Sequence, residues 1–374
     1  MYIVLVILLV LHGLIHLLGF VKGFGLAPIE QLTVAISRPW GLVWLLVAIL
    51  MLAAAGARLA GLGAWWMVAA PALVGSQVLV IAFWQDAKFG TIANVLIAIA
   101  VIVGFGTWRF DGASARSVRG LVERVADAPS SPLLAAELAG LPPIVRSWVT
   151  RSGAVGRPRP RVVHLRQRGE MQTAKDGRWM PFRAEQWFTP TAPGFVWVVD
   201  VEAAPGVHMA GRDAYVDGRG SMRIELLSLV PVVDARGPRL DQGALVRYLA
   251  EVIWFPAHAT GLRWEEIDAT SARATLVDGE TTASGVYTFT ADGDLLRFEA
   301  RRYREETLED WLVEIDPHGH GELGGLRIPL RSSVSWKLAE GPWTWLRLEV
   351  VGLDEDAAVP STFPSPFPSP SRGE

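Results

Sequence analysis

The sequence predicts a four-helix membrane bundle followed by an α+β soluble domain, a curved antiparallel sheet or half-barrel with a few covering helices. The distribution of charge predicts the first part. Residues 1–108 contain only four Lys or Arg and two acidic residues, whereas the other 266 residues contain 31 and 36. The mean hydropathy of +0.29 is high for a chain of 374 residues. Short alternating runs separated by Asp-Gly pairs predict the sheet.

Four apolar runs are long enough to cross a bilayer, since about 20 helical residues span its hydrocarbon core. They cover residues 1–20, 40–62, 64–84 and 90–108. The first lacks the basic start and cleavage site of a secretory signal, so we expect it to be retained. With four crossings, the N-terminus and the soluble domain lie on the same side. The basic residues favour a multi-pass protein of the bacterial cytoplasmic membrane with a cytoplasmic soluble domain.

Polar residues inside the bundle are the first candidate site. His12 and His16 lie four residues apart and share a helix face. Gln77 lies in the third run and Asp86 at its far end. One interpretation is a hydrogen bond between helices, from His12 or His16 to Ser76 or Gln77. The alternative is a bound ligand, a quinone or a proton relay.

The segment 109–160 is expected to form juxtamembrane helices and a linker. Helices are predicted at 114–128 and at 133–151, the second broken by the proline pair at 142–143. The soluble sheet domain follows at 161–356, and 357–374 is predicted to be a disordered tail because proline recurs at alternate positions.

The sheet domain should be an antiparallel meander interrupted by one helix. That helix is expected to begin at Asp241 as N-cap and to stop before Pro256. The predicted strands are 161–171, 179–188, 195–202, 213–216, 221–227, 272–277, 281–290, 295–303, 311–315, 327–338 and 345–351.

A sheet with an apolar face needs a cover, and few helices are available here. The uncovered part predicts a concave apolar surface that binds a ligand. The residues expected to line it are aromatic: Trp179, Phe182, Trp187, Phe195, Trp197, Trp254, Phe255 and Trp336. For any single tryptophan, the alternative is that it fills the core.

No enzyme motif is present: the sequence contains no G-x-S-x-G, P-loop or H-E-x-x-H. With no cysteine, thiol chemistry and iron–sulfur sites are excluded. No catalytic residue, metal site or cofactor is predicted. An enzyme of unknown class remains an alternative, with carboxylate and histidine groups in the same cavity: His164, Glu170, Glu185, Glu251 and His258. A third hypothesis is a sensor built into the membrane bundle.

Several motifs resemble known but uncharacterised proteins. HGLIHLLGF at 12–20, SRP at 37–39 and DAKFG at 86–90 resemble the membrane segment of a group of uncharacterised bacterial proteins. QRGEM at 167–171, GRWMPF at 177–182, DAYVDG at 213–218 and YLAEVIWFP at 248–256 resemble the domain of unknown function that follows it. The meander with an inserted helix also resembles the half-barrel of periplasmic lipoprotein carriers. This likeness implies a membrane-anchored binding protein for a lipid, an acyl chain or a lipidated partner protein, and no nucleic acid is expected.

Overall fold

The computed structural model describes residues 2–359, which form two compact units. The helical unit contains the chain up to Gly112 together with Leu227–Leu229, and the sheet unit contains Ala113–Leu226 and the chain from Val230 onward. Most of the predicted tail, from residue 360, lies outside the described residues.

The helical unit consists of α1 (Tyr2–Gly23), α2 (Arg38–Leu59), α3 (Trp66–Ala82), α4 (Trp84–Ala87) and the first part of α5 (Gly90–Glu123). Three of these helices, α1, α2 and α5, are long and apolar enough to cross a membrane. α3 is apolar but has 17 residues. The predicted break after residue 108 was wrong, because α5 continues without interruption through Asp111 and Gly112.

The exposed surface of this unit is apolar, which is the reverse of a soluble helical bundle. Tryptophan, methionine and small residues fill its interior, including Trp44, Met51 and Ala69. Large aliphatic side chains point outward, among them Ile3, Ile7, Leu46, Ile81 and Ile99. A helix that exposes such residues needs an apolar solvent, so this pattern is typical of lipid-facing helices.

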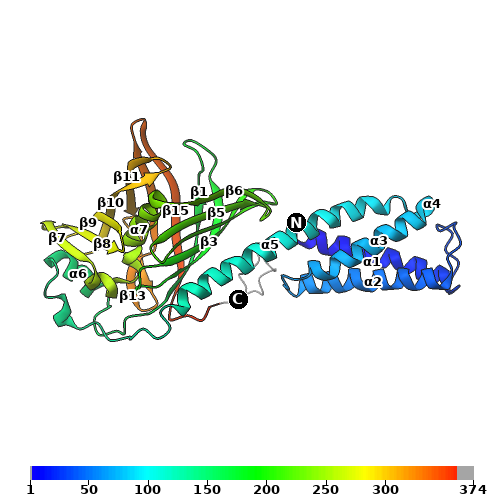
Figure 1. Ribbon diagram of the computed structural model, residues 1–374, viewed down its shortest axis with the longest axis horizontal. Helices are drawn as coiled ribbons and strands as arrows, with labels where there is room; N and C mark the ends of the chain where they lie inside the picture. Colours follow the sequence, from blue (N-terminus) through cyan, green and yellow to red (C-terminus); the bar gives the residue numbers. More distant parts are fainter. Residues whose placement is uncertain (1, 360–374) are drawn as a thin grey trace. The chain divides into compact units, whose positions relative to one another are not determined.

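The sheet unit is built on one antiparallel sheet of 13 strands in the order β6-β5-β4-β3-β2-β1-β15-β14-β11-β10-β9-β8-β7 (Figure 1). The sheet is not closed, so β6 and β7 are its edges. The strands are β1 (Val163–Met171), β2 (Met180–Phe188), β3 (Phe195–Ala204), β4 (Val207–Val216), β5 (Arg219–Leu226), β6 (Val230–Arg236), β7 (Arg263–Asp268), β8 (Ser271–Asp278), β9 (Thr281–Phe289), β10 (Leu295–Arg304), β11 (Thr307–Ile315), β14 (Arg331–Leu338) and β15 (Gly341–Glu355).

Most predicted strands are present, but β6, β7 and β12 (His320–Leu323) were not predicted and one predicted strand is divided. The predicted strand 327–338 is two strands, β13 (Leu326–Pro329) and β14. β13 pairs with β12 in a separate two-stranded sheet. The Asp-Gly turns are confirmed at β4–β5, where Asp217 and Gly218 both have positive φ and so form the turn that suits a two-residue hairpin.

Helix α7 (Pro238–Glu251) connects the two edges and packs against β4, β5, β8, β9 and β10 (Figure 1). Its N-cap is Gly237, four residues before the predicted N-cap, because Pro238 suits the first helical turn. Asp241 does not cap the helix; its carboxylate accepts a hydrogen bond from the backbone of Gly220.

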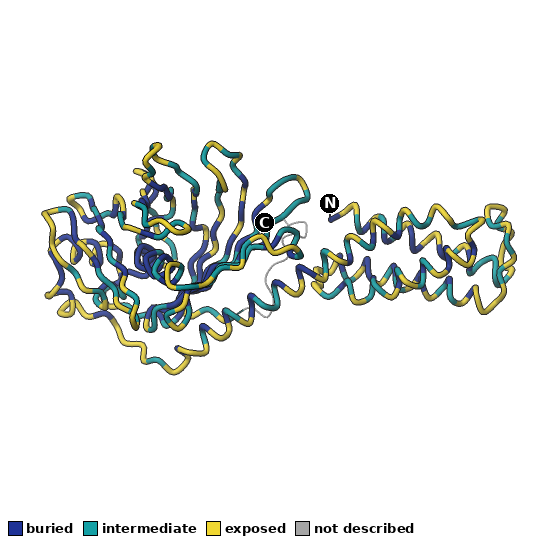
Figure 2. The backbone as a smooth tube through the Cα atoms, turned by 45° about the horizontal axis from the view of Figure 1, so that its top comes forward, coloured by how far each residue is buried: buried dark blue, intermediate teal, exposed yellow. Residues whose placement is uncertain are grey.

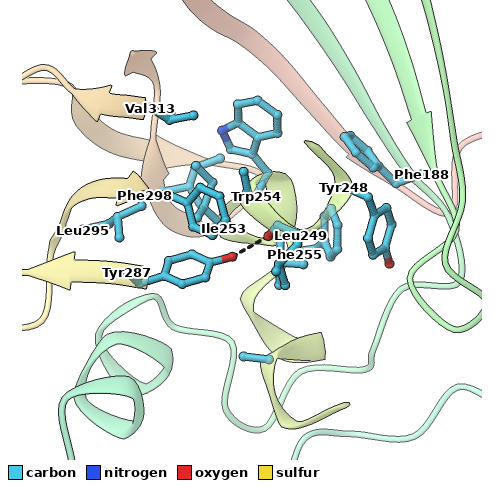
Figure 3. Packing of buried hydrophobic residues seen from close by; sticks show 14 of the residues in the cluster. Phe188, Tyr248, Leu249, Ile253, Trp254, Phe255, Tyr287, Leu295, Phe298 and Val313 are labelled. Carbon is cyan, nitrogen blue, oxygen red and sulfur yellow. Dashed lines mark hydrogen bonds between the residues drawn. The ribbon is translucent and has the colours of Figure 1, made fainter. Parts of the chain in front are cut away.

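The main core lies between α7 and the sheet. Figure 3 shows Tyr248, Leu249 and Ile253 packed against Phe188 on one side and Phe298 on the other. The short helices η1 (Ala135–Leu138), α6 (Pro143–Arg151), η2 (Val252–Trp254) and η3 (Pro256–Gly261) complete this cover. The predicted break at the proline pair is confirmed, since α6 begins at Pro143.

The other face of the sheet is covered by the C-terminal part of α5. Val118, Leu121 and Val125 are fully buried, and a Cβ on Gly194, in the β2–β3 turn, would meet Leu121. Arg124 forms an ion pair with Asp217 in the β4–β5 turn. Both faces of the β2–β4 region are therefore covered.

Candidate functional site

A layer of charged side chains crosses the face of the sheet that packs against α7, which we call the concave side. The layer lies inside an otherwise apolar core. Arg247 of α7 lies between two carboxylates. Its Nη1 donates to Asp213 of β4 at 2.6 Å, and its Nε donates to Glu251, one turn further along α7, at 2.9 Å. The three side chains are only 14%, 6% and 12% exposed. Buried charges are stable only when they are paired, so this triad ties α7 to β4.

Amide and indole groups extend the charged layer across three strands. Gln186 of β2 donates to Glu251 at 2.8 Å, and Gln167 of β1 donates to Gln186 at 3.1 Å. The indole Nε1 of Trp197 on β3 donates to Gln167 at 2.8 Å. The layer is therefore a continuous hydrogen-bonded chain from β3 to α7.

Burial and pairing act in opposite directions on these groups. Burial raises the pKa of Glu251, although Arg247 and Gln186 act to lower it. Burial acts to lower the pKa of Arg247, but Glu251 and Asp213 outweigh it, and the pKa is raised. Arg247 thus stays charged, and its charge keeps the buried carboxylates stable.

One end of the concave face is less covered than the rest. Met171, Met209, Leu338 and Trp343 pack against the core but remain partly exposed. They lie where β1 and β14 end and where β4 and β15 begin, which is the same end of an antiparallel sheet. At the opposite end, Phe188 is fully buried. In Figure 2 the interior of the sheet unit is coloured as buried, and the turns at its surface are coloured as exposed.

The predicted aromatic residues fall into separate groups. The registers of β1, β2 and β3 place Phe182 and Phe195 on the core face, and Trp197 and Trp336 pack against the same core. Trp254 and Phe255 lie just after α7 and are fully packed. Trp187 lies on the opposite face, where it stacks on His164. Trp179 lies under the guanidinium of Arg347, which pairs with Glu170.

The carboxylate and histidine groups considered for an enzyme are mostly scattered. His164 and Glu185 come together at 3.2 Å, on the face opposite the core. Glu170 is an ion-pair partner of Arg347 on the surface. His258 Nε2 donates to the carbonyl oxygen of Pro160 at 3.0 Å, and burial lowers the pKa of His258 to about 4. Among residues 2–359 no group of three or more acidic or histidine side chains could hold a metal ion.

In the helical unit, the polar side chains form a buried network. His12 Nε2 lies 3.0 Å from Ser76 and 2.9 Å from Asn94 Oδ1, and Asn94 donates to Gln77 at 3.0 Å. A hydrogen bond between helices was one prediction, and it is present. His16 Nδ1 lies 2.7 Å from the carbonyl oxygen of His12.

Asp86 is not part of this network. Its carboxylate accepts hydrogen bonds from the backbone of Thr33 and Val34, in the segment between α1 and α2. It therefore orders a connecting loop.

Sequence reasoning missed Asp213, Arg247, Gln186 and Arg302 on the concave side, and Asn94 in the bundle. Two signals were available. Arg247 and Glu251 are four apart on a helix whose other positions are mostly apolar, so their ion pair lies among buried residues. Arg302 has the same parity along β10 as the core residues Phe298 and Ala300.

A cavity of about 530 Å³ lies where β9 and β10 diverge, and Trp311 of β11 is among the residues that line it. Its lining includes charged groups of both signs, among them Arg273, Glu299, Arg301, Asp310 and Lys337. Gln242 of α7 also lines it and bonds to the unpaired backbone of Arg301 and Tyr303. This lining is too polar for an acyl chain.

Comparison with known proteins identifies a family whose function is unknown. No curated protein matches the chain. A crystal structure of a DUF1329 family protein from Desulfovibrio piger is similar with a TM-score of 0.35 and 11% identity, over 62% of this chain and 96% of that chain. The family described as DUF6544, a family of unknown function, matches residues 132–348, which include nearly the whole sheet and α7. The chain belongs to the DUF6544 family.

Proposed function

We propose that the protein is a membrane-anchored binding protein that holds an apolar or amphiphilic ligand on the concave side of its sheet. The observation that carries the proposal is the partly exposed end of that face, at Met171, Met209, Leu338 and Trp343. Burying each methylene group of a ligand there would contribute about 0.8 kcal/mol. Of the predicted aromatic residues, Trp197 is partly exposed on this face and is the first candidate for contact.

The helical unit would serve as the anchor. We propose that α3 is a fourth crossing, since its 17 residues rise about 26 Å and α4 follows directly. Four crossings would put the N-terminus and the sheet unit on the same side, and we propose the cytoplasmic side because more of the flanking basic residues lie there. Anchoring raises the local concentration of lipid, so a modest affinity suffices. A fluorescent reporter fused after residue 356 should be active in the cytoplasm, whereas activity of a periplasmic reporter there would contradict this topology.

Photocrosslinking of the full chain in its membrane tests ligand binding. p-Benzoylphenylalanine in place of Met209 would lie on the partly exposed core face, and in place of Arg168 it would lie on the opposite face of β1. Irradiation should attach a lipid or acyl compound at position 209, detected by mass spectrometry of the peptide, and not at position 168. Equal labelling at both positions, or none at 209, would overturn the proposal.

A further inference from the structure

Arg302 of β10 is a buried cation without a carboxylate partner. The residue is 8% exposed, and no acidic side chain of the described residues lies within ion-pairing distance of it. Its Nε donates to the carbonyl of Gly243 on α7 at 2.8 Å, which is the one hydrogen bond that its side chain makes within residues 2–359. A guanidinium group carries five N–H donors, so most of them lack an acceptor.

Two indole rings hold the guanidinium in place. Its Cζ lies 5.0 Å from the ring centroid of Trp311 and 5.9 Å from that of Trp336. Both tryptophans are buried, on β11 and β14, the two strands next to β10. Aromatic faces attract a cation but do not accept its hydrogen bonds in the plane of the guanidinium. The position and orientation of the Arg302 guanidinium are therefore fixed, while most of its N–H donors have no acceptor in the described chain.

A second, independent donor beside Arg302 also lacks an acceptor. Trp311 is 4% exposed, and its Nε1 is buried with no hydrogen-bond partner in the described chain. An unpaired buried donor costs about 1–3 kcal/mol, so a ligand atom that accepts its hydrogen bond would be stabilised there.

The nearby carboxylates do not fill this role. Asp213 accepts from Arg247 through Oδ2 and Glu251 accepts from it through Oε1, and neither carboxylate lies within ion-pairing distance of Arg302. Burial lowers the pKa of Arg302 to about 10, so the group is still charged at neutral pH. Asp213 Oδ1 is also buried with no hydrogen-bond partner among the described residues, so one carboxylate oxygen of this layer is unpaired together with Arg302 and the indole N–H of Trp311.

We infer that Arg302 and Trp311 bind the anionic head group of an amphiphile, a carboxylate or phosphate on an apolar chain, whose chain lies along the partly exposed end of the concave face. This inference rests on the proposed function and specifies the class of ligand. A planar guanidinium suits the two oxygens of a carboxylate or phosphate. Trp336 and Trp343, on adjacent strands, offer an apolar path away from the head group.

The test uses the full chain in amphipol and the fluorescent fatty acid 11-(dansylamino)undecanoic acid, competed by dodecanoate, dodecyl phosphate, dodecanol or inorganic phosphate. Dodecanoate and dodecyl phosphate should compete at least tenfold more strongly than dodecanol, and inorganic phosphate should not compete. Arg302→Met should weaken the two anions about tenfold or more and leave dodecanol unchanged. Arg302→Lys should restore part of the preference for the two anionic compounds over dodecanol. The matched control is Arg297→Met, an exposed arginine on the same strand that pairs with Glu299, and it should change nothing.

The outcomes separate the two proposals. If dodecanol competes as well as dodecanoate and Arg302→Met alters neither, the anionic site is refuted while apolar binding stands. If no compound with a chain competes, the proposed function itself is refuted. If only inorganic phosphate competes, the site binds a free anion and the amphiphile is refuted. Trp311→Phe keeps the ring and removes the N–H, so it should weaken the anions about threefold even if Arg302→Met fails to fold.

Discussion

Removing the charge of Arg247 tests whether the buried triad holds α7 to the sheet. In Arg247→Met the carboxylates of Asp213 and Glu251, 6% and 12% exposed, would lose their only cationic partner among the described residues. Breaking a buried ion pair by removing one partner costs about 3–5 kcal/mol. For a domain of this size, this corresponds to a fall in melting temperature of roughly 6–20 °C.

The loss should depend on pH. The pKa of Glu251 is already raised by burial, and without Arg247 it would rise further. A group whose pKa is higher in the folded state stabilises the fold at pH values below the pKa that it has in the unfolded chain. This stabilisation disappears as the pH rises through the pKa that the group has in the folded protein. Arg247→Met should therefore lose most stability at pH 8 and less at pH 5.

Thermal unfolding of the full chain, followed by tryptophan fluorescence at both pH values, measures the effect. The control is Arg168→Met, which breaks an exposed pair with Glu349 and should cost at most about 1 kcal/mol. If the two variants melt at the same temperature at pH 8, the triad does not stabilise the fold and the reasoning is wrong.

Three further predictions concern other parts of the molecule. Asn94→Ala removes a side chain that links three polar partners in the bundle, and should cost about 1–2 kcal/mol in detergent unfolding assays; an unchanged melting point would contradict a structural role. Gly285→Ala places a Cβ 2.2 Å from the ring of Phe298 and should destabilise the sheet by about 1–3 kcal/mol in the same assay, whereas wild-type stability would show that the core can yield. Asp200 raises the pKa of His208, so Asp200→Asn should destabilise the protein slightly below pH ~6.5 and much less above it, and a histidine NMR titration should show a lower pKa.

The sequence predicted most of the sheet because its turns and alternation are local signals. Edge strands were missed for a physical reason: β6 contains Pro231 and exposed valines, and β7 consists mainly of exposed charged residues, so neither alternates as a half-buried strand does. The separate helices expected at 90–108 and 114–128 are one continuous helix, α5, because the intervening residues do not interrupt it.

The candidate site was less predictable. Side-chain parity along β2 places Trp187 and Phe182 on opposite faces, so they could not both line one surface. The charged layer is harder to find, because its members come from β1, β2, β3, β4 and α7, and only the pair on α7 is local in sequence. Contacts that depend on the folded topology leave no spacing pattern in the chain.

The pairing of β1 with β15 has a consequence for biosynthesis. β1 lies between β2 and β15, and Val163 is paired with Glu355, near the end of the described chain. Strands β1–β6 can assemble on the ribosome, but one side of β1 stays open until β15 emerges. Nascent chains of this protein should therefore be most prone to misassembly just before β15 is synthesised, and a stop codon upstream of β15 would leave two half-sheets with no strand to join them.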